Sequence, residues 1–180
     1  MDDASDNGIL VKPDETMLEE IASYRAAFLA AGEKIYGAGL LPEFEDSKDW
    51  LHHNRISEHR ETVPAGRVPS EQFVLFRKSD HKIVGMITFR HEFNDFTREY
   101  GGNIGYSVHP GERGKGHAKR MLKECLERCR AFGLDRVLIT CRVENEASRR
   151  TILSCGGVYE STVYCARDDA TLERYWIELR

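Results

Sequence analysis

The chain has 180 residues, of which 41% are hydrophobic and 31% are charged, and its formal net charge is −4. These values are ordinary for a globular domain, and a slightly acidic chain lacks the basic face that general nucleic-acid binding requires. Because no apolar stretch approaches the roughly 20 residues of a membrane span and no signal peptide precedes Ile9, we expect a cytoplasmic protein that binds neither nucleic acid nor membrane.

The first half of the chain is predicted to alternate helices, strands and loops. Between Met17 and Phe28 the apolar residues recur three and four positions apart, which is typical of a helix packed on one side. The predicted segments are, in order, a flexible tail over residues 1–8, a strand over 9–12, a helix that ends near Gly32, a helix capped by Asp46, and a loop over 61–70 that contains proline and glycine. Residues 9–180 are expected to form a single domain.

A β-hairpin is predicted next. Residues 73–76 and 83–89 are rich in valine, isoleucine and phenylalanine, and they flank the turn sequence Ser-Asp-His. Residues 91–100 then predict a connecting loop. It begins with His91, and histidine is the side chain that titrates nearest to neutral pH.

A short strand, a basic loop with two glycines and a helix together predict a phosphate site. Residues 103–108 predict the strand, and Pro110 ends it because proline lacks a backbone N–H. The loop that follows reads Glu-Arg-Gly-Lys-Gly-His-Ala. Glycines let backbone N–H groups approach phosphate oxygens, and the start of the next helix directs free N–H groups and the positive end of its dipole at the same place. Arg113, Lys115 and His117 add side-chain charge.

The glycine spacing excludes two common phosphate motifs. A P-loop requires Lys and then Ser or Thr after its second glycine, but His117 and Ala118 follow Gly116. A dinucleotide fingerprint requires a third Gly or Ala where this chain has Lys119. The remaining pattern is Arg-x-x-Gly-x-Ala, which begins at Arg113. In isolation such a loop is also common in surface turns, so the elements around it decide the interpretation.

Two helices and a strand are predicted after the loop. The apolar residues from Ala118 to Cys129 form a helical stripe, and Gly133 is placed to end that helix. Residues 137–141 predict a buried strand. Asn145 then offers an N-cap to a second helix, which a Gly-Gly pair ends.

The five cysteines predict core packing rather than chemistry. No Cys-x-x-Cys pair occurs, so we expect neither a disulfide framework nor a metal site. Cys125 and Cys129 lie one helical turn apart on the apolar stripe, where cysteine behaves as a small hydrophobic residue.

This order of elements resembles the core of the GNAT superfamily of N-acetyltransferases. The loop from Arg113 to Ala118 is similar to the coenzyme A pyrophosphate loop of that family, and the Asn-x-x-Ser and Gly-Gly sequences of the last helix are similar to the element that contacts the pantetheine arm. The resemblance covers about residues 9–180. It implies an α/β fold with a mixed, mostly antiparallel central sheet flanked by helices, in which a splayed pair of parallel strands holds the cofactor.

The resemblance also implies a reaction and its partners. Acetyl-CoA is the expected co-substrate, and its acetyl group is expected to pass directly to a primary amine on a small molecule or a peptide. A homodimer is a candidate assembly. The cofactor-binding residues that the family motifs imply are Val108, Arg113, Gly114, Lys115, Gly116, His117, Ala118, Asn145 and Ser148. The backbone N–H of Val108 is the expected donor to the thioester oxygen.

The catalytic acid departs from the family pattern. Many members place a tyrosine seven residues after the Asn, where this chain has Ile152, which cannot donate a proton. Ser148 is the candidate substitute, because it lies in the first turn of the same helix, where the dipole favours negative charge. For the general base the candidates are His91, Glu92 and Glu160.

Two other functions stay open from the sequence. Ile152 at the acid position also fits a protein that binds acyl-coenzyme A with little or no catalysis, and the loop also fits a nucleotide-binding domain of another kind. Arg90 fits either a contact to an acidic acceptor or a plain position at the sheet edge. The sequence does not identify the amine.

Overall fold

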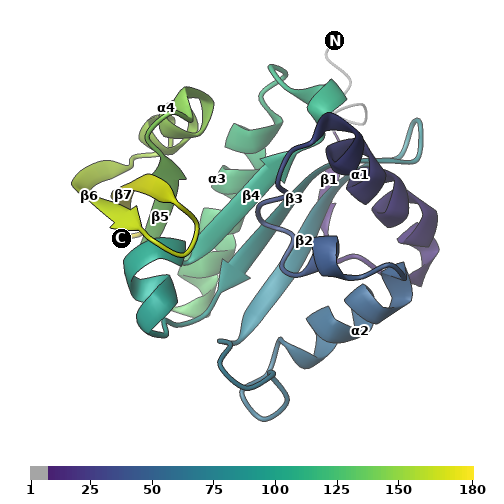
Figure 1. Cartoon of the computed structure of the whole chain (residues 1–180), viewed down its shortest axis with the longest axis horizontal. Helices are drawn as coiled ribbons and strands as arrows, with labels where there is room; N and C mark the ends of the chain where they lie inside the picture. Colours follow the sequence, from purple (N-terminus) through teal and green to yellow (C-terminus); the bar gives the residue numbers. More distant parts are fainter. Residues whose placement is uncertain (1–7) are drawn as a thin grey trace.

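The computed structural model describes residues 8–180 and contains one seven-stranded sheet in the order β1-β2-β3-β4-β5-β7-β6 (Figure 1). The strands are β1 (Ile9–Val11), β2 (Ser70–Arg77), β3 (Lys82–Arg90), β4 (Ile104–Val108), β5 (Arg136–Arg142), β6 (Val158–Cys165) and β7 (Ala170–Glu178). The helices are α1 (Leu18–Ala31), α2 (Ser47–Ile56), α3 (His117–Phe132) and α4 (Glu146–Ser154). The predicted flexible tail lies outside the described residues except for Gly8, which is buried beside Phe76.

The sheet is mixed, and within residues 8–180 a single pair of parallel strands interrupts an otherwise antiparallel arrangement. β4 pairs with β5 where Ile104 lies opposite Ile139. Asn103 reinforces this junction, because its backbone N–H donates to the Leu138 carbonyl at 2.7 Å and its Oδ1 accepts the Leu138 N–H at 2.8 Å. Both strands continue beyond the junction without further pairing to each other, so they diverge. The predicted mixed sheet with a splayed parallel pair is confirmed.

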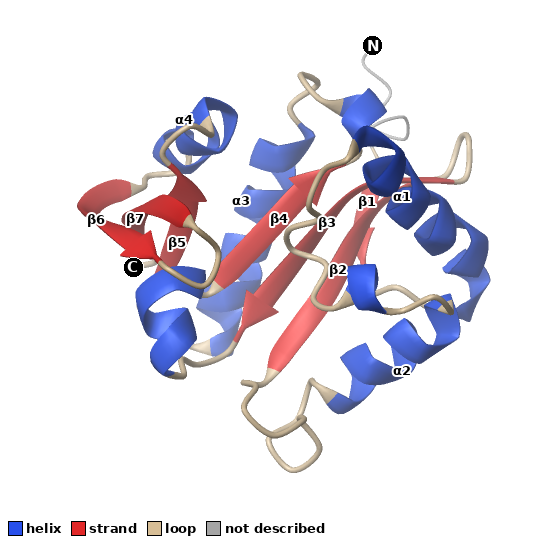
Figure 2. Cartoon of the chain, in the orientation of Figure 1, coloured by secondary structure: helices blue, strands red, loops and turns tan. Residues whose placement is uncertain are grey.

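Helices cover both faces of the sheet (Figures 1 and 2). α1 and α2 pack on one face, where α1 buries Ile21, Tyr24 and Phe28 at the helical spacing seen in the sequence. α3 and α4 pack on the other face, and α3 buries Cys125 and Cys129 completely. The predicted packing role of these two cysteines is confirmed.

The predicted helix ends also occur in the structure. The Asn145 side chain accepts the backbone N–H of Ser148 at 3.1 Å, so Asn145 is the N-cap of α4. Gly133 ends α3 with a φ of 102°, a left-handed conformation that glycine adopts without steric cost. None of the described helices is long and apolar enough to cross a membrane.

Two segments differ from the sequence prediction. The sequence predicts a loop over residues 91–100, but the segment contains the start of a π-helical turn, η3 (Thr97–Gly101), because the Asn94 and Thr97 side chains and backbones exchange hydrogen bonds that close a turn there. The hairpin formed by β6 and β7 is absent from the sequence prediction. β7 inserts between β5 and β6, and local sequence does not reveal such a pairing.

Candidate functional site

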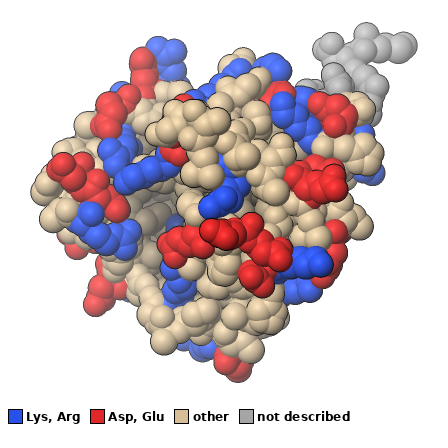
Figure 3. Space-filling model, turned by 45° about the vertical axis from the view of Figure 1, so that its right-hand side comes forward, with Lys and Arg blue, Asp and Glu red and all other residues tan. Residues whose placement is uncertain are grey.

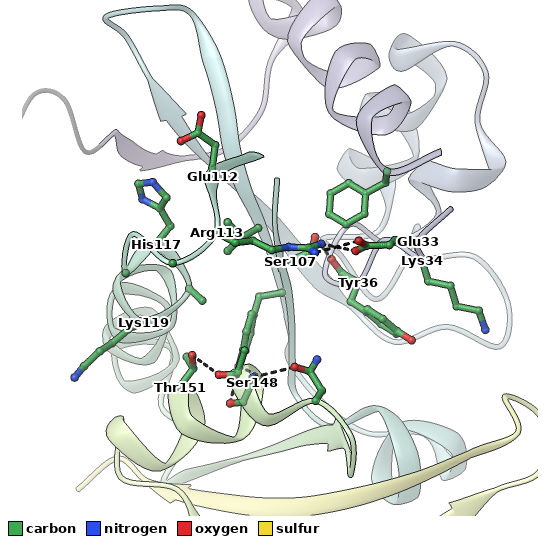
Figure 4. A pocket seen from close by; sticks show the side chains of 18 of the residues that line it. Glu33, Lys34, Tyr36, Ser107, Glu112, Arg113, His117, Lys119, Ser148 and Thr151 are labelled. Atoms are coloured by element: carbon green, nitrogen blue, oxygen red, sulfur yellow. Dashed lines mark hydrogen bonds and ion pairs between the residues drawn. The ribbon is translucent and has the colours of Figure 1, made fainter. Parts of the chain in front are cut away.

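A cavity of about 750 Å³ opens where β4 and β5 diverge. Its walls come from the segment after α1, from β4, from the glycine loop and the start of α3, and from the start of α4 (Figure 4). The residues predicted from the sequence that line it are Val108, Arg113, Gly114, Gly116, His117, Ala118, Asn145 and Ser148. The fold therefore brings almost the whole predicted cofactor set to one cavity.

The glycine loop presents unused backbone donors to this cavity. Gly114 and Gly116 have φ angles of 77° and 82°, which side-chain-bearing residues rarely adopt. Gly116 is the N-cap of α3, none of the described side chains caps the helix, and its first turn carries no acidic residue. The first N–H groups of α3 are therefore available at the positive end of the helix dipole. This donor set fits the diphosphate of coenzyme A.

Glu112 anchors the loop from beneath. Its side chain is only 5% exposed, and its carboxylate forms ion pairs with Arg77 at 3.0 Å and with Lys82 and Lys115 at 2.8 Å each. The hydrogen bonds from Arg77, followed by those from the two lysines, hold the pKa of Glu112 well below its usual range. Lys115 thus directs its ammonium group to Glu112, and it is the one predicted cofactor residue that does not line the cavity among the described residues.

Arg113 spans the mouth of the cavity. Its guanidinium pairs with the Glu33 carboxylate at 2.5 and 3.1 Å and lies over the Phe28 ring (Figure 4). This pair connects the glycine loop to the segment that follows α1. Both side chains are about half exposed, so the pair contributes at most about 1 kcal/mol and is readily exchanged for another partner.

The free edge of β4 faces the gap between the strands. The His109 N–H donates to the Val84 carbonyl, and hydrogen-bonded pairs alternate along an antiparallel ladder. Ser107 therefore also faces β3, whereas the backbone groups of Tyr106 and Val108 point toward the side of β5. Because β4 and β5 have already diverged there, these N–H groups are available to a carbonyl oxygen in the cavity. Sequence reasoning named the Val108 donor but not the Tyr106 donor.

A phenol and a hydroxyl meet inside the cavity. The Tyr106 Oη lies 2.8 Å from the Ser148 Oγ, which links β4 to the first turn of α4. Burial raises the pKa of Tyr106 well above its usual value, so its phenol stays protonated at neutral pH. Sequence reasoning missed Tyr106, because a tyrosine within a strand-like run signals only β structure.

Ile152 is buried in the core. It has 0% exposure, and it packs so closely on Gly157 that a Cβ added to the glycine would come within 2.5 Å of the Ile152 side chain. The position at which many family members carry a tyrosine therefore does not face the cavity in this chain. The only tyrosines among the described lining residues are Tyr36 and Tyr106.

The three predicted bases lie away from the cavity. The His91 Nε2 is 3.1 Å from a Glu71 carboxylate oxygen, and the His91 ring stacks on Phe132 with 4.4 Å between the ring centroids. Glu92 pairs with Arg60, and Glu160 pairs with Arg174. The geometry brings none of the three to the cavity lining.

A second cavity of about 290 Å³ adjoins the first. The residues that line both cavities are Lys34, Tyr36, Tyr106, Arg142, Asn145 and Ser148. The second cavity extends toward Arg90 and the η3 turn. Gly37 seats the segment after α1 against β4, because a Cβ at this position would lie 2.3 Å from the Gly105 carbonyl oxygen.

The described residues contain no cluster of three or more metal-ligating side chains. The face shown in Figure 3 is hollowed, and acidic and basic side chains are interspersed around the hollow instead of forming a continuous basic surface.

Comparisons with known proteins agree with the geometry. The model of the acetyltransferase (GNAT) family matches residues 31–156. A comparison with curated protein sequences gives no match.

Several solved structures share the fold. YncA from Salmonella typhimurium, determined with acetyl-CoA, has a TM-score of 0.64 at 16% identity over 97% of this chain and 95% of its own. RimL, a ribosomal L7/L12 α-N-protein acetyltransferase determined with coenzyme A, has a TM-score of 0.69 at 16% identity over 94% and 92%. A mutant of the spermidine N-acetyltransferase SpeG from Vibrio cholerae has a TM-score of 0.63 at 15% identity over 95% of each chain. At these identities the likeness shows the fold alone.

Proposed function

The chain belongs to the GNAT acetyltransferase family, and we propose that it is an N-acetyltransferase that moves the acetyl group of acetyl-CoA directly to a primary amine. The observation that carries this proposal is one continuous cavity with two different ends. Uncapped N–H groups of α3 lie at one end, and the Tyr106–Ser148 pair lies at the other.

The glycine loop and α3 supply the diphosphate contacts in this proposal. The backbone N–H groups from Gly114 to Ala118 would bind the phosphate oxygens, and Arg113 and Lys119 would contribute charge from the cavity wall. Arg113 exchanges Glu33 for phosphate at little cost, because that ion pair is half exposed. Glu112 holds the loop in position through its three cationic partners.

The divergent strands supply the contacts at the reacting end. Bound acetyl-CoA provides an activated acyl group. The backbone N–H groups of Val108 and Tyr106 polarise the thioester carbonyl and stabilise the negative charge that develops on its oxygen. Asn145 keeps Ser148 in place by capping α4, and it lines both cavities.

Tyr106 and Ser148 act as the acid. Ser148 donates its proton toward the departing sulfur, and Tyr106 returns a proton to Ser148 across their 2.8 Å contact. Tyr106 then regains a proton from water, which has taken up the proton that the amine loses. Burial raises the pKa of Tyr106, so its phenol is protonated when the thioester is cleaved. Tyr106 thus supplies from β4 the phenol that α4 lacks at Ile152.

The attacking amine must be neutral. The cationic side chains of Lys34 and Arg142, which line both cavities, disfavour the ammonium form, which lowers the pKa of a bound amine and eases the loss of its proton to water. This route does not use the three predicted bases, which lie elsewhere.

The test combines binding with turnover. Calorimetric titration with coenzyme A should show binding, and thiol release from acetyl-CoA should depend on an added primary amine. Binding without thiol release for any amine would indicate the alternative, an acyl-CoA-binding protein with little or no catalysis. A melting shift with ATP and none with coenzyme A would exclude the proposed cofactor.

A further inference from the structure

The second cavity is lined mainly by cations. Among the described residues, its wall carries the four cationic side chains of Lys34, Arg90, Arg142 and Arg167. The one carboxylate in the described lining belongs to Asp168, and it already pairs with Arg167 at 3.3 Å. The cavity therefore has a net positive lining.

Arg90 is the less exposed of the two lining cations, Lys34 and Arg90, that have no carboxylate partner among the described residues. Its Nη1 donates to the Gly101 and Gly102 carbonyls at 3.2 Å each. In the described part of the chain no carboxylate pairs with it, and neither its Nε nor its Nη2 has a hydrogen-bond partner. Burial, and then the neighbouring Arg67, lower the pKa of Arg90 to about 10. A partly buried charge without a counterion is costly, so an anion in this cavity would stabilise it.

Two further guanidinium groups are held around the same space. Arg142 donates through Nε to the Tyr36 hydroxyl at 3.2 Å, and its Nη1 pairs with Glu144, which lies outside the lining, at 3.3 Å. Arg167 lies over the Phe96 ring, with 3.5 Å from its Cζ to the centroid. Guanidinium groups fixed by other contacts suit carboxylate and phosphate, whose oxygens accept paired N–H donors.

We propose that this cavity binds an anionic group of the acceptor, so that the amine acetylated by this protein is a small molecule that carries a carboxylate or a phosphate. This inference rests on the proposed function and names its substrate class. The cavity shares Tyr106, Asn145 and Ser148 with the first one, so an acceptor anchored near Arg90 places its other end at the acyl-transfer site. A volume of about 290 Å³ lies at the lower end for ligand pockets, which favours a small acceptor.

The same lining disfavours polyamines. A second ammonium group would enter a space whose described charged residues are predominantly positive, where like charges repel. The spermidine acetyltransferase with the same fold is thus not a guide to this acceptor.

The test uses three amines of equal chain length. 4-Aminobutyrate, n-butylamine and 1,4-diaminobutane end in a carboxylate, a methyl group and an ammonium group. We expect kcat/KM to fall in that order, with at least about tenfold between the first two, as for loss of one charge-assisted hydrogen bond. 3-Aminopropyl phosphate identifies whether phosphate or carboxylate is preferred. Equal or better use of n-butylamine or 1,4-diaminobutane than of both anionic amines would overturn the proposal.

Substitution of Arg90 locates the effect. Arg90→Met should lower kcat/KM for the preferred anionic amine by about tenfold to a hundredfold and leave n-butylamine within about twofold. Because Arg90 also holds the η3 turn, Arg167→Met serves as a second variant, since its side chain is 64% exposed and tolerates removal. Arg167→Met should likewise lower kcat/KM for the anionic amine relative to n-butylamine. Arg55→Met, an exposed position on α2, is the control. An equal loss for all amines in both cavity variants would overturn the proposal.

A binding measurement separates this proposal from the proposed function. Calorimetry with the coenzyme A-loaded protein should show tighter binding of the anionic amines than of n-butylamine, whether or not acetyl transfer occurs. Anion preference without thiol release would support the acceptor site and contradict the enzyme. Thiol release with no anion preference would support the enzyme and contradict the acceptor site.

Discussion

Tyr106 of β4 and Ser148 of α4 share a hydrogen bond of 2.8 Å, although 42 residues separate them in the sequence. Removal of either hydroxyl should slow acetyl transfer, because general-acid catalysis typically contributes about 10²–10⁴-fold. We expect Tyr106→Phe and Ser148→Ala to lower kcat by such factors with little change in coenzyme A affinity. The double variant should lose no more than the worse single variant, since the two groups act as one unit.

Tyr24→Phe, which removes a buried phenol outside the cavity lining, is the matched control. Turnover at the unsubstituted rate in both single variants would remove the pair from the mechanism.

The pH dependence should lack an alkaline fall. Burial disfavours the charged phenolate, so the folded-state pKa of Tyr106 lies above the usual value of about 10 for tyrosine. The protonated acid, and the stability that its neutral form contributes, are then fully present below that value and are lost only as the pH rises toward the raised pKa. We expect kcat to rise as the acceptor amine deprotonates and to stay level to about pH 10. A descending limb between pH 8 and 9 that disappears in Tyr106→Phe would contradict this assignment.

Gly116 should be essential for cofactor binding. Its φ of 82° disfavours any side chain, and bulk at this point would enter the space where the loop meets phosphate. Gly116→Trp should abolish detectable binding of coenzyme A in calorimetry. Gly133→Trp is a matched control, because it also has positive φ and open space but lies at the far end of α3. Unchanged affinity in folded Gly116→Trp would refute the loop assignment.

Glu112 should stabilise both the fold and the loop. Removal of its charge breaks the ion pairs with Lys82 and Lys115 and leaves Arg77 paired with Asp80 only, and we expect Glu112→Gln to cost about 3 kcal/mol in urea unfolding at pH 7. Because the folded-state pKa of Glu112 is depressed, its contribution is present above the unfolded value of about 4.3 and is lost as the pH falls toward the folded value. The difference in the free energy of unfolding between the two proteins should therefore shrink in acid.

Glu127→Gln, at an exposed position, is the control and should change stability by less than about 0.5 kcal/mol. A full difference that persists at pH 2 would contradict this account.

Gly37 should tolerate no side chain, whereas its neighbour Gly39 should. Both have positive φ, but a Cβ at Gly37 would overlap the backbone of Gly105, whereas a Cβ at Gly39 has no atom nearer than 3.9 Å. Gly37→Ala should cost more than about 3 kcal/mol through strain and overlap, and Gly39→Ala only about 1 kcal/mol. Thermal unfolding measures both. Equal melting temperatures would show that the segment after α1 is not seated on β4 as described.

The sequence predicted the region around the glycine loop well because local signals agree there. Proline ends β4, Gly116 and Gly133 bound α3, and Asn145 caps α4, and each of these effects acts within a few residues. The cofactor side of the site follows from the order of strand, glycine loop and helix, because the end of β4 and the start of α3 together fix the position of the loop between them.

The parts of the fold and of the site that the sequence did not predict depend on pairings between distant segments. β7 is inserted between β5 and β6, and no local pattern specifies that order. The Tyr106–Ser148 hydrogen bond joins β4 to α4, and Glu112 forms ion pairs with Arg77 and Lys82, which belong to the hairpin of β2 and β3. His91 illustrates the same limit, because its position after β3 suggested the site, whereas its ring stacks on Phe132 of α3. Residue type alone does not distinguish these outcomes.

The divergence of β4 and β5 makes the native sheet incomplete without its ligand. An extended molecule with amide groups that lies in the gap would act as a surrogate strand, and saturation a hundredfold above its dissociation constant would add about 2.7 kcal/mol to stability. Under the proposed function, resistance of this protein to proteolysis would then report how much coenzyme A the surrounding solution holds.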